Sequence, residues 1–200
     1  MHEFLGFFFV PSLPEKARAI ARLGVANVAK VMLRFRSRFW EERSLPAVPP
    51  GSDITSPGFI VSRDEWMPTR WTSHPVYAPV LTGWAGGPAA DRFGPASGRL
   101  AAGQAVQALS RIFGLSASEI HEQLDEWYTH NWRLDPFARG AYSYVYAGGI
   151  PAQRAFARPM DGTLFFAGEA TNTEGHSGTL HGAIATGRRA ASEVISALKK

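Results

Sequence analysis

The C-terminal part of the sequence constrains the fold most, because a glycine-containing loop joins a short apolar run there to a long amphipathic segment. The run TLFFAGEA at residues 163–170 predicts a short buried strand that ends at Gly168 and Glu169. Residues 179–198 predict a helix. Its expected apolar stripe contains Leu180, Ala183, Gly187, Ala191, Val194 and Leu198. A strand, a glycine-containing loop and a helix in this order would place Glu169 in a crevice at the strand end.

This arrangement has the chemistry of a ligand-binding site. The carboxylate of Glu169 can accept hydrogen bonds from ligand hydroxyl groups, and glycines allow the backbone to approach a flat ligand closely. A helix that begins near Thr179 presents unpaired N–H groups and the positive end of its dipole, which stabilise negative charge. The same pattern also fits an ordinary strand–loop–helix unit with an exposed glutamate. From the residues alone, both interpretations stay open.

The N-terminal part of the chain predicts a helix and then a strand. In SLPEKARAIARLG, Pro14 suits a first helical turn and Gly24 suits a helix end. Residues 25–40 are rich in valine, leucine and phenylalanine and predict a strand. Alternation along this strand places Lys30 between apolar neighbours. We therefore expect apolar surroundings for Lys30, and burial lowers the pKa of a lysine.

The other segments predict a mixture of strands and helices. The apolar run at residues 4–10 has the character of a strand, and residues 64–75 are expected to be irregular. Strands are expected at residues 58–62 and 76–90, a helix at 99–113, a second helix from Ser116 with Glu119 completing a capping box, and a strand, a turn and an aromatic-rich stretch at 126–145.

Charge and hydropathy restrict the partners. The chain has 21 lysines and arginines against 17 aspartates and glutamates, a net charge of +4. Nucleic-acid binders usually concentrate basic residues on one face, and the densest basic cluster here contains glutamates, so we expect no nucleic-acid partner. The longest apolar run, residues 4–10, is too short to cross a bilayer, so we expect no membrane partner.

Cysteine is absent from the sequence, which excludes disulfides, thiolate metal sites and a cofactor linked through cysteine. The absence fits a reducing compartment, and we expect a cytoplasmic protein. His176 and His181 are five residues apart and have no nearby carboxylate pair. This spacing makes poor metal chemistry, so we expect no metal site.

Three motifs of this chain resemble those of one family. The C-terminal flavin-binding segment of flavin-containing amine oxidases is closely similar to FFAGEATNTEGHSGTLHGAIATGRRAA. The tryptophan-containing active-site segment of the family resembles NWRLDPFARGAYSYV, and its lysine-bearing strand resembles ANVAKVMLRFRSRFW. The motifs follow the order of the family, and the resemblance is greatest to polyamine oxidases and to the oxidase domain of lysine-specific histone demethylases.

The resemblance implies an α/β fold of mixed α+β character in two domains. Residues 1–26 would return from an FAD-binding domain, and residues 27–150 would form a substrate-binding domain with a mixed sheet and helices. Residues 151–200 would supply the terminal strand and helix of the FAD-binding domain. The fingerprint G-x-G-x-x-G, which cradles the FAD pyrophosphate, appears nowhere in the sequence. The chain therefore resembles the C-terminal half of an amine oxidase, and a separate N-terminal FAD-binding half is an expected partner.

Positions that match the family motifs carry implied roles. Lys30 resembles the lysine that holds a water against the flavin N5, and Tyr142 is the second candidate catalytic residue. Trp132 and Phe137 resemble aromatic residues beside the isoalloxazine ring. Glu169 resembles the glutamate that binds the ribityl chain. The implied cofactor-binding residues are Trp132, Phe137, Gly168, Glu169, Thr179 and Leu180. A strand lysine in an ion pair and ordinary aromatic packing are the structural alternatives.

The implied reaction is oxidation of an amine C–N bond by non-covalent FAD, with a small-molecule amine and dioxygen as partners. The amine would become an imine and then an aldehyde or ketone, while dioxygen is reduced to hydrogen peroxide. Thr179 stands where monoamine oxidases have a tyrosine, which favours the polyamine oxidase side of the family. Two alternatives stay open: a non-catalytic module that needs an N-terminal partner, and another FAD oxidase or desaturase with the same flavin-binding tail.

Overall fold

The protein folds into two compact units. The computed structural model describes residues 9–10, 12–42, 45–47, 58–63, 66–94 and 97–199. One unit, called the ribbon unit below, comprises the chain up to Ala26 and the chain from Ala141 onward. The other, called the sheet unit, comprises Asn27–Gly140. The chain therefore passes from one unit to the other twice. The apolar run predicted at residues 4–10 lies almost entirely outside the described residues.

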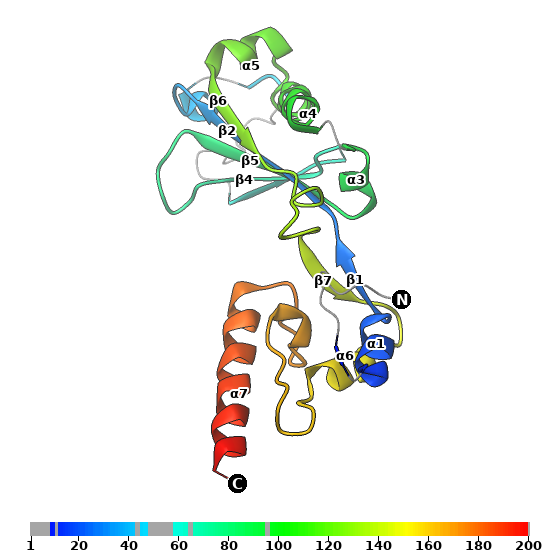
Figure 1. Ribbon diagram of the computed structural model, residues 1–200. Coiled ribbons are helices and arrows are strands. Elements are labelled where there is room, and N and C mark those ends of the chain that lie inside the picture. The colour runs from blue at the N-terminus through cyan, green and yellow to red at the C-terminus, as the bar shows by residue number, and fades with distance from the viewer. Residues whose placement is uncertain are drawn as a thin grey trace. The chain divides into compact units, whose positions relative to one another are not determined.

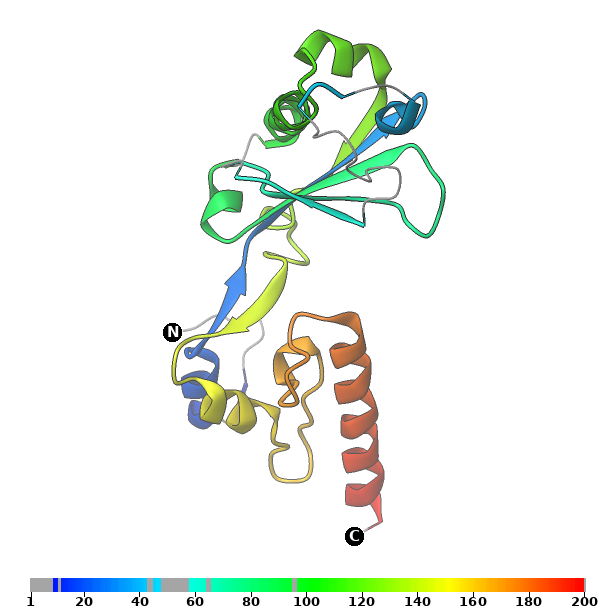
Figure 2. The same cartoon turned by 180° about the vertical axis from the view of Figure 1, so that it is seen from behind.

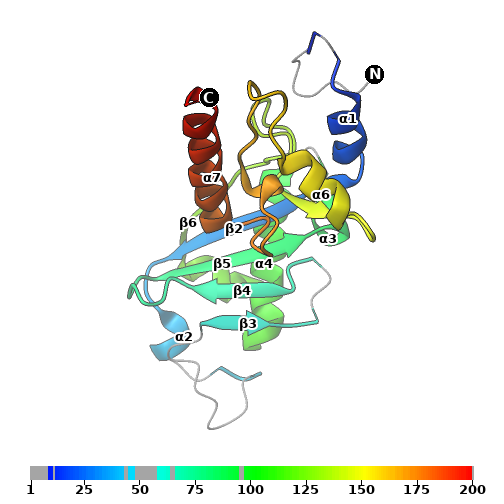
Figure 3. The same cartoon turned by 90° about the horizontal axis from the view of Figure 1, so that it is seen from below.

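A five-stranded sheet forms the centre of the sheet unit, with the strand order β3-β4-β5-β2-β6 (Figure 3). Its strands are β2 (Val28–Phe35), β3 (Phe59–Val61), β4 (Thr69–Thr72), β5 (Val80–Gly86) and β6 (Leu124–Thr129). The strand pairs described in this sheet are all antiparallel, so the parallel pairing that a mixed sheet requires is not seen among the described residues. The strand β4 lies in a segment that the sequence predicted to be irregular, and that prediction is wrong.

The helix α4 (Ser97–Phe113) covers one face of this sheet (Figure 1). Alternate residues of β2 point toward it, so that Leu33 and Phe35 are buried together with Leu109 of the helix. The remaining helices are α2 (Phe39–Glu42), α3 (Pro88–Asp91) and α5 (Ala117–Gln123). Helix α5 begins at the predicted capping box. A continuous apolar core therefore holds the sheet, α2 and α4 together.

The ribbon unit is built differently, on two short strands and helices around them (Figure 2). Its elements are α1 (Pro14–Ile20), β1 (Leu23–Ala26), β7 (Tyr142–Val145), α6 (Ile150–Ala157), the 3₁₀-helix η1 (Glu169–Thr171) and α7 (Leu180–Leu198). Strands β1 and β7 are antiparallel. The single strand predicted at residues 25–40 is thus divided between two sheets, with Asn27 between β1 and β2.

A buried lysine, Lys16, joins helix α1 to the C-terminal end of helix α6 in the ribbon unit. The Nζ atom of Lys16 donates hydrogen bonds to the carbonyl oxygens of Ala155 (2.7 Å), Phe156 (3.0 Å) and Arg158 at the end of α6. It also lies 4.3 Å from the ring centre of Phe166. The side chain is 3% exposed, and burial lowers the pKa of Lys16. Three carbonyl acceptors nevertheless match the three donors of an ammonium group.

Two predictions about the C-terminal segment are wrong. Residues 163–168 form no strand, apart from an isolated bridge between Met160 and Leu164. A strand needs a hydrogen-bonding neighbour, and among the described residues the β1–β7 pair does not extend to this segment. The predicted apolar stripe of α7 is also not its buried face, since Leu180 is 79% and Leu198 is 82% exposed. The face that is buried carries Gly182, Thr186 and Ala190 instead.

Candidate functional site

The carboxylate of Glu169 joins three segments of the ribbon unit. Its Oε1 atom accepts a hydrogen bond from the backbone N–H of Ser143 at 2.8 Å. Its Oε2 atom accepts from the Ser143 hydroxyl at 2.8 Å and from the backbone N–H of Gly178 at 2.6 Å. Glu169 belongs to η1, Ser143 to β7, and Gly178 to the loop before α7. We call these three residues the carboxylate clasp.

Several predicted site residues lie next to the clasp. Tyr142 precedes Ser143 on β7, and a Cβ atom placed on Gly178 would lie 3.5 Å from the Tyr142 ring. Gly168 precedes Glu169, and its φ of 118° is one that residues with a side chain rarely adopt. The hydroxyl of Thr186 on α7 fixes this glycine, since it accepts a hydrogen bond from the Gly168 N–H at 3.0 Å.

The N-terminus of α7 begins directly after the clasp. Thr179 is its N-cap, and the Thr179 hydroxyl accepts a hydrogen bond from the Gly182 N–H at 3.1 Å. Within the described part of the chain, the N–H groups of Leu180 and His181 have no acceptor among the hydrogen bonds found. Such free N–H groups and the positive end of the helix dipole make a place where a polar or anionic group is stabilised.

Buried polar side chains also hold the loop between η1 and α7. The carboxamide of Asn172 accepts hydrogen bonds from the N–H groups of Glu174 (3.1 Å) and His176 (2.9 Å). The Gln153 side chain on α6 donates to the Ser177 hydroxyl at 2.7 Å. Asn172 and Gln153 are 2% and 3% exposed, so the loop is fixed from the interior.

In the sheet unit, Lys30 lies on the face of β2 that is turned away from α4. The expected burial of Lys30 is wrong, because Lys30 is exposed while Val31 beside it is buried. Its Nζ atom lies 5.7 Å from the ring centre of Trp71 on β4, and Trp84 on β5 is its partner in the register. Lys30 forms no ion pair with any acidic residue among those described. The result is an ammonium group near the indole ring of Trp71.

The aromatic segment after β6 carries two further predicted residues. Phe137 is 92% exposed and Trp132 is 43% exposed. The His130 ring lies against the indole of Trp132, with ring centres 4.5 Å apart, and its Nε2 atom is 2.8 Å from Asp135 Oδ2. Two hydrogen bonds hold the pKa of Asp135 below its ordinary value. The one from the Phe137 N–H group has the larger effect, and the one from His130 has the smaller. The turn predicted at Asp135 is therefore also an anchor for the aromatic segment.

The structure divides the predicted site residues between the two units. All five residues that lie at or next to the carboxylate clasp belong to the ribbon unit: Glu169 is part of the clasp, and Tyr142, Gly168, Thr179 and Leu180 are near its members in the sequence. Lys30, Trp132 and Phe137 belong to the sheet unit. The supporting residues that the sequence did not predict are Ser143, Gln153, Asn172 and Thr186. Only Ser143 leaves a signal in the sequence, as a small polar residue between the aromatic residues Tyr142 and Tyr144.

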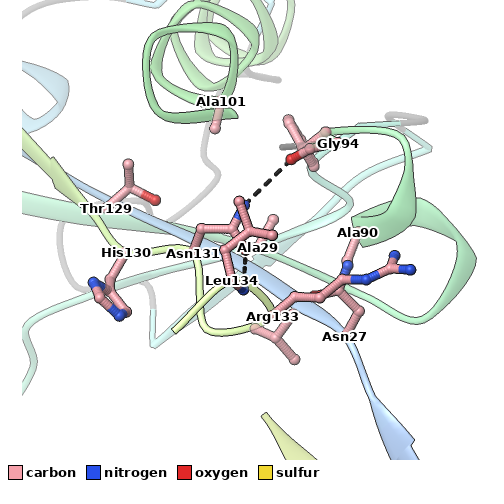
Figure 4. Close-up of a pocket in the computed structure, with 12 residues that line it drawn as sticks. Asn27, Ala29, Ala90, Gly94, Ala101, Thr129, His130, Asn131, Arg133 and Leu134 are labelled. Carbon is pink, nitrogen blue, oxygen red and sulfur yellow. Dashed lines mark hydrogen bonds between the residues drawn. The ribbon is translucent and has the colours of Figure 1, made fainter. Parts of the chain in front are cut away.

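A pocket of about 280 Å³ opens in the sheet unit beside the start of β2 (Figure 4). Its floor includes Ala29 and Ala90, and the amide of Asn131 spans it to the carbonyl oxygen of Gly94 at 3.3 Å. None of the predicted site residues lines it.

Among the described residues there is no group of three or more metal-ligating side chains. None of the helices described is long and apolar enough to cross a membrane.

Comparison with known proteins identifies the family of the chain. The profile of the family "Flavin containing amine oxidoreductase" matches residues 8–195, which is nearly the whole chain. The chain belongs to this family. Flavin is therefore the cofactor of the family to which the chain belongs, and the α/β fold class expected from the sequence is confirmed.

Curated relatives include "Histone demethylase-like protein A" of Aspergillus fumigatus, which is 34% identical over 200 residues. "Lysine-specific histone demethylase 1 homolog 1" of Oryza sativa subsp. japonica is 31% identical over 198 residues. These matches cover 95% and 96% of this chain, but only 18% and 22% of the relatives. The chain thus spans about a fifth of the length of these relatives.

Solved structures of amine oxidases share the fold. The cyclohexylamine oxidase from Brevibacterium oxydans IH-35A superposes with a TM-score of 0.76 at 22% identity, over 98% of this chain and 41% of the oxidase. A putrescine oxidase variant, A394C, gives a TM-score of 0.76 at 19% identity, over 96% of this chain and 40% of the oxidase. This chain therefore corresponds in fold to a part of these oxidases.

Proposed function

We propose that this chain supplies the flavin-ring end of an FAD-dependent amine oxidase. The observation that carries the proposal is the carboxylate clasp, which gathers Tyr142, Gly168 and the N-terminus of α7 around Glu169. These residues come from three separate segments, and each is one for which the family resemblance implies a role at the flavin.

The groups around the clasp suit a flavin. Glu169 has two oxygen atoms with about four acceptor positions, and the clasp uses three of them, so one position on Oε1 is open to a ribityl hydroxyl. A Cβ placed on Gly168 would meet no atom within 4 Å, which leaves open space at that backbone. The N–H groups at the start of α7 would stabilise negative charge on the ring.

When bound, the flavin supplies the redox chemistry, because it accepts the electrons removed from the amine. In our proposal, Lys30 Nζ holds a water by a hydrogen bond, and the ring of Trp71 gives it an apolar neighbour. Trp132 and Phe137 would exclude bulk water and orient the apolar part of the amine. Tyr142 would provide the phenol wall next to the clasp.

The proposed substrate is a small-molecule amine, with dioxygen as the final oxidant. The names of the relatives mention histone demethylases, and those of the solved structures mention oxidases of cyclohexylamine and putrescine. They share an amine as the reacting group. The polyamine-like substrate and the cytoplasmic location are predictions made from the sequence.

Uptake of flavin tests the proposal directly. The purified chain is mixed with FAD and freed of excess cofactor by gel filtration, and its visible absorbance is measured. We expect retained flavin for the natural chain and much less for Glu169→Gln, because an amide nitrogen cannot accept the clasp hydrogen bonds. The matched control is Glu174→Gln, an exposed glutamate in the same loop. Equal retention by both variants would contradict the assignment of Glu169.

We propose, as a second candidate function, a module that becomes active only with a separate FAD-binding half. Three observations favour it: the sequence has no G-x-G-x-x-G fingerprint, residues 163–168 form no strand, and the outer stripe of α7 is exposed. That stripe includes Leu180, Ile184, Ile195 and Leu198, all at least half exposed. An apolar stripe of this kind is typical of a helix that packs on a further layer.

Co-purification distinguishes the two candidates. The chain is co-expressed with an FAD-binding half that carries the fingerprint, taken from a relative. We expect a yellow complex for the natural chain and none for the double variant Ile195→Glu/Leu198→Glu. The control is Ser192→Glu/Ser196→Glu, which adds the same charges at exposed polar positions of α7. A natural chain that retains FAD without the second half would rule the dependent module out.

A further inference from the structure

Ser143 occupies an unusual position for a serine. It lies on β7 between Tyr142 and Tyr144, which are 36% and 46% exposed, while Ser143 itself is 9% exposed. In a strand with one face toward the interior, the inward residue is normally apolar. Here the order is reversed, with large rings outside and a hydroxyl inside, so the buried hydroxyl requires a specific partner.

The partner is the carboxylate of Glu169. Ser143 contacts both of its oxygens, since the backbone N–H donates to Oε1 and the hydroxyl donates to Oε2, each at 2.8 Å. Two parallel hydrogen bonds fix the rotation of the carboxylate plane, which one bond alone would leave free. The third bond, from the Gly178 N–H to Oε2, then fixes where the loop before α7 lies relative to β7.

We propose that Ser143 is a positioning residue of the flavin site. It holds the Glu169 carboxylate in the one orientation that binds Gly178 and leaves an acceptor position on Oε1. Through Glu169 it sets the separation between Tyr142 and the N-terminus of α7. This inference rests on the proposed function, because the positioned groups are those we assign to the flavin.

Two substitutions and one control separate the role of the hydroxyl from general folding. Ser143→Ala removes the bond to Oε2 and keeps the backbone bond to Oε1. Ser143→Thr retains a hydroxyl group. The control is Ser192→Ala, whose hydroxyl on α7 donates to the Arg188 carbonyl at 3.1 Å and, among the hydrogen bonds of the described residues, to no member of the clasp. Thermal unfolding of each variant reports whether it folds.

The first measurement needs no flavin. Amide hydrogen exchange of Gly178 is followed by NMR in the isolated chain, because this N–H is protected only while the clasp is closed. We expect about tenfold faster exchange at Gly178 in Ser143→Ala, as for a net loss of one hydrogen bond to a charged group. Ser143→Thr and Ser192→Ala should exchange like the natural chain. Unchanged exchange at Gly178 in Ser143→Ala would overturn the proposal.

The second measurement uses FAD as the probe. In protein that binds FAD, alone or with its FAD-binding half, Ser143→Ala should weaken binding about tenfold and alter the visible band of the flavin. Ser143→Thr should restore both. Faster exchange with unchanged affinity and band would overturn the positioning role while leaving the clasp as a structural contact. If no form binds FAD, the proposed function fails, and the exchange measurement alone decides whether Ser143 orders the start of α7.

Discussion

The two units of this protein are stabilised in different ways. The sheet unit has a continuous apolar core in which Phe35, Phe39, Trp40 and Phe113 meet edge to face. Among its described residues, the ribbon unit has few buried apolar side chains and relies on polar groups. The buried Lys16, Gln153 and Thr186 and the partly exposed Glu169 and Arg189 all bind backbone or side-chain atoms from other segments. Hydrophobic burial is tolerant of small shifts, whereas such hydrogen bonds are directional. Among the described residues, the unit with the clasp therefore depends more on directional contacts and has fewer buried apolar side chains.

The largest effect expected from this comparison is in the sheet unit. Phe113→Ala should lower the free energy of unfolding by about 4 kcal/mol, because it opens a cavity beside Phe39 in the apolar core. The control is Leu100→Ala on the same helix, where the side chain is 42% exposed and the cost should be below about 1 kcal/mol. Denaturant unfolding measures the loss of stability, and amide hydrogen exchange shows which of the two units has lost it. A loss spread equally over both units would show that they do not have separate sources of stability.

The ribbon unit should be most sensitive at Lys16. Lys16→Met keeps the length of the side chain and leaves three carbonyl oxygens without their donor, which should cost about 3 kcal/mol. Arg18→Met on the exposed side of α1 is the matched control. Hydrogen exchange in α6 should rise while exchange in α4 stays constant. If Lys16→Met is as stable as the control, buried polar groups are not the main source of stability in this unit.

Lys30 tests the chemistry rather than the fold. Lys30→Met should slow reduction of the flavin by an amine about a hundredfold in the complex with an FAD-binding half, since the water that Lys30 holds would lose its partner. Its exposure on β2 predicts little change in the melting temperature. Stopped-flow absorbance measures the reduction. An unchanged rate would favour a desaturase or other oxidase that shares the flavin-binding tail.

The smallest expected effect is the pH dependence of the aromatic segment. The pKa of Asp135 is lowered in the folded protein, so its contribution to stability is fully present above the ordinary value of 3.8 and is lost as the pH falls through the lowered value. Below pH 3.8, NMR signals of Phe137 and Trp132 should therefore broaden. In Asp135→Asn the signals should show no such step. A step that persists in this variant would assign it to another carboxylate.

Local patterns predicted the elements whose causes are local. The capping box of Ser116 and Glu119 marked the start of α5, and the helix predicted at residues 99–113 is α4. The family itself, which the three motifs predicted, is confirmed by the match over residues 8–195.

Other features were out of reach, because their causes lie far away in the sequence. The side of β2 that holds Lys30 depends on where α4 packs, and apolar neighbours occur on both faces of that strand. The buried face of α7 is set by small residues such as Gly182 against His176, which no hydropathy pattern marks. The clasp joins Ser143 to Glu169 across 26 positions, so only the folded backbone brings them together.

The passage between the units lies at a single point of the β1–β7 pair. The N–H group of Ala141 donates to the carbonyl oxygen of Ala26 at 2.9 Å, and Ala26 is paired with Tyr142 in the register. The segment between them, Asn27–Gly140, thus begins and ends next to two residues whose backbones are hydrogen-bonded to each other. A two-residue turn in its place would close an ordinary β-hairpin. The sheet unit is therefore arranged like an insertion at the tip of a hairpin. Deleting it should give a smaller protein that retains Glu169 and its hydrogen-bond donors.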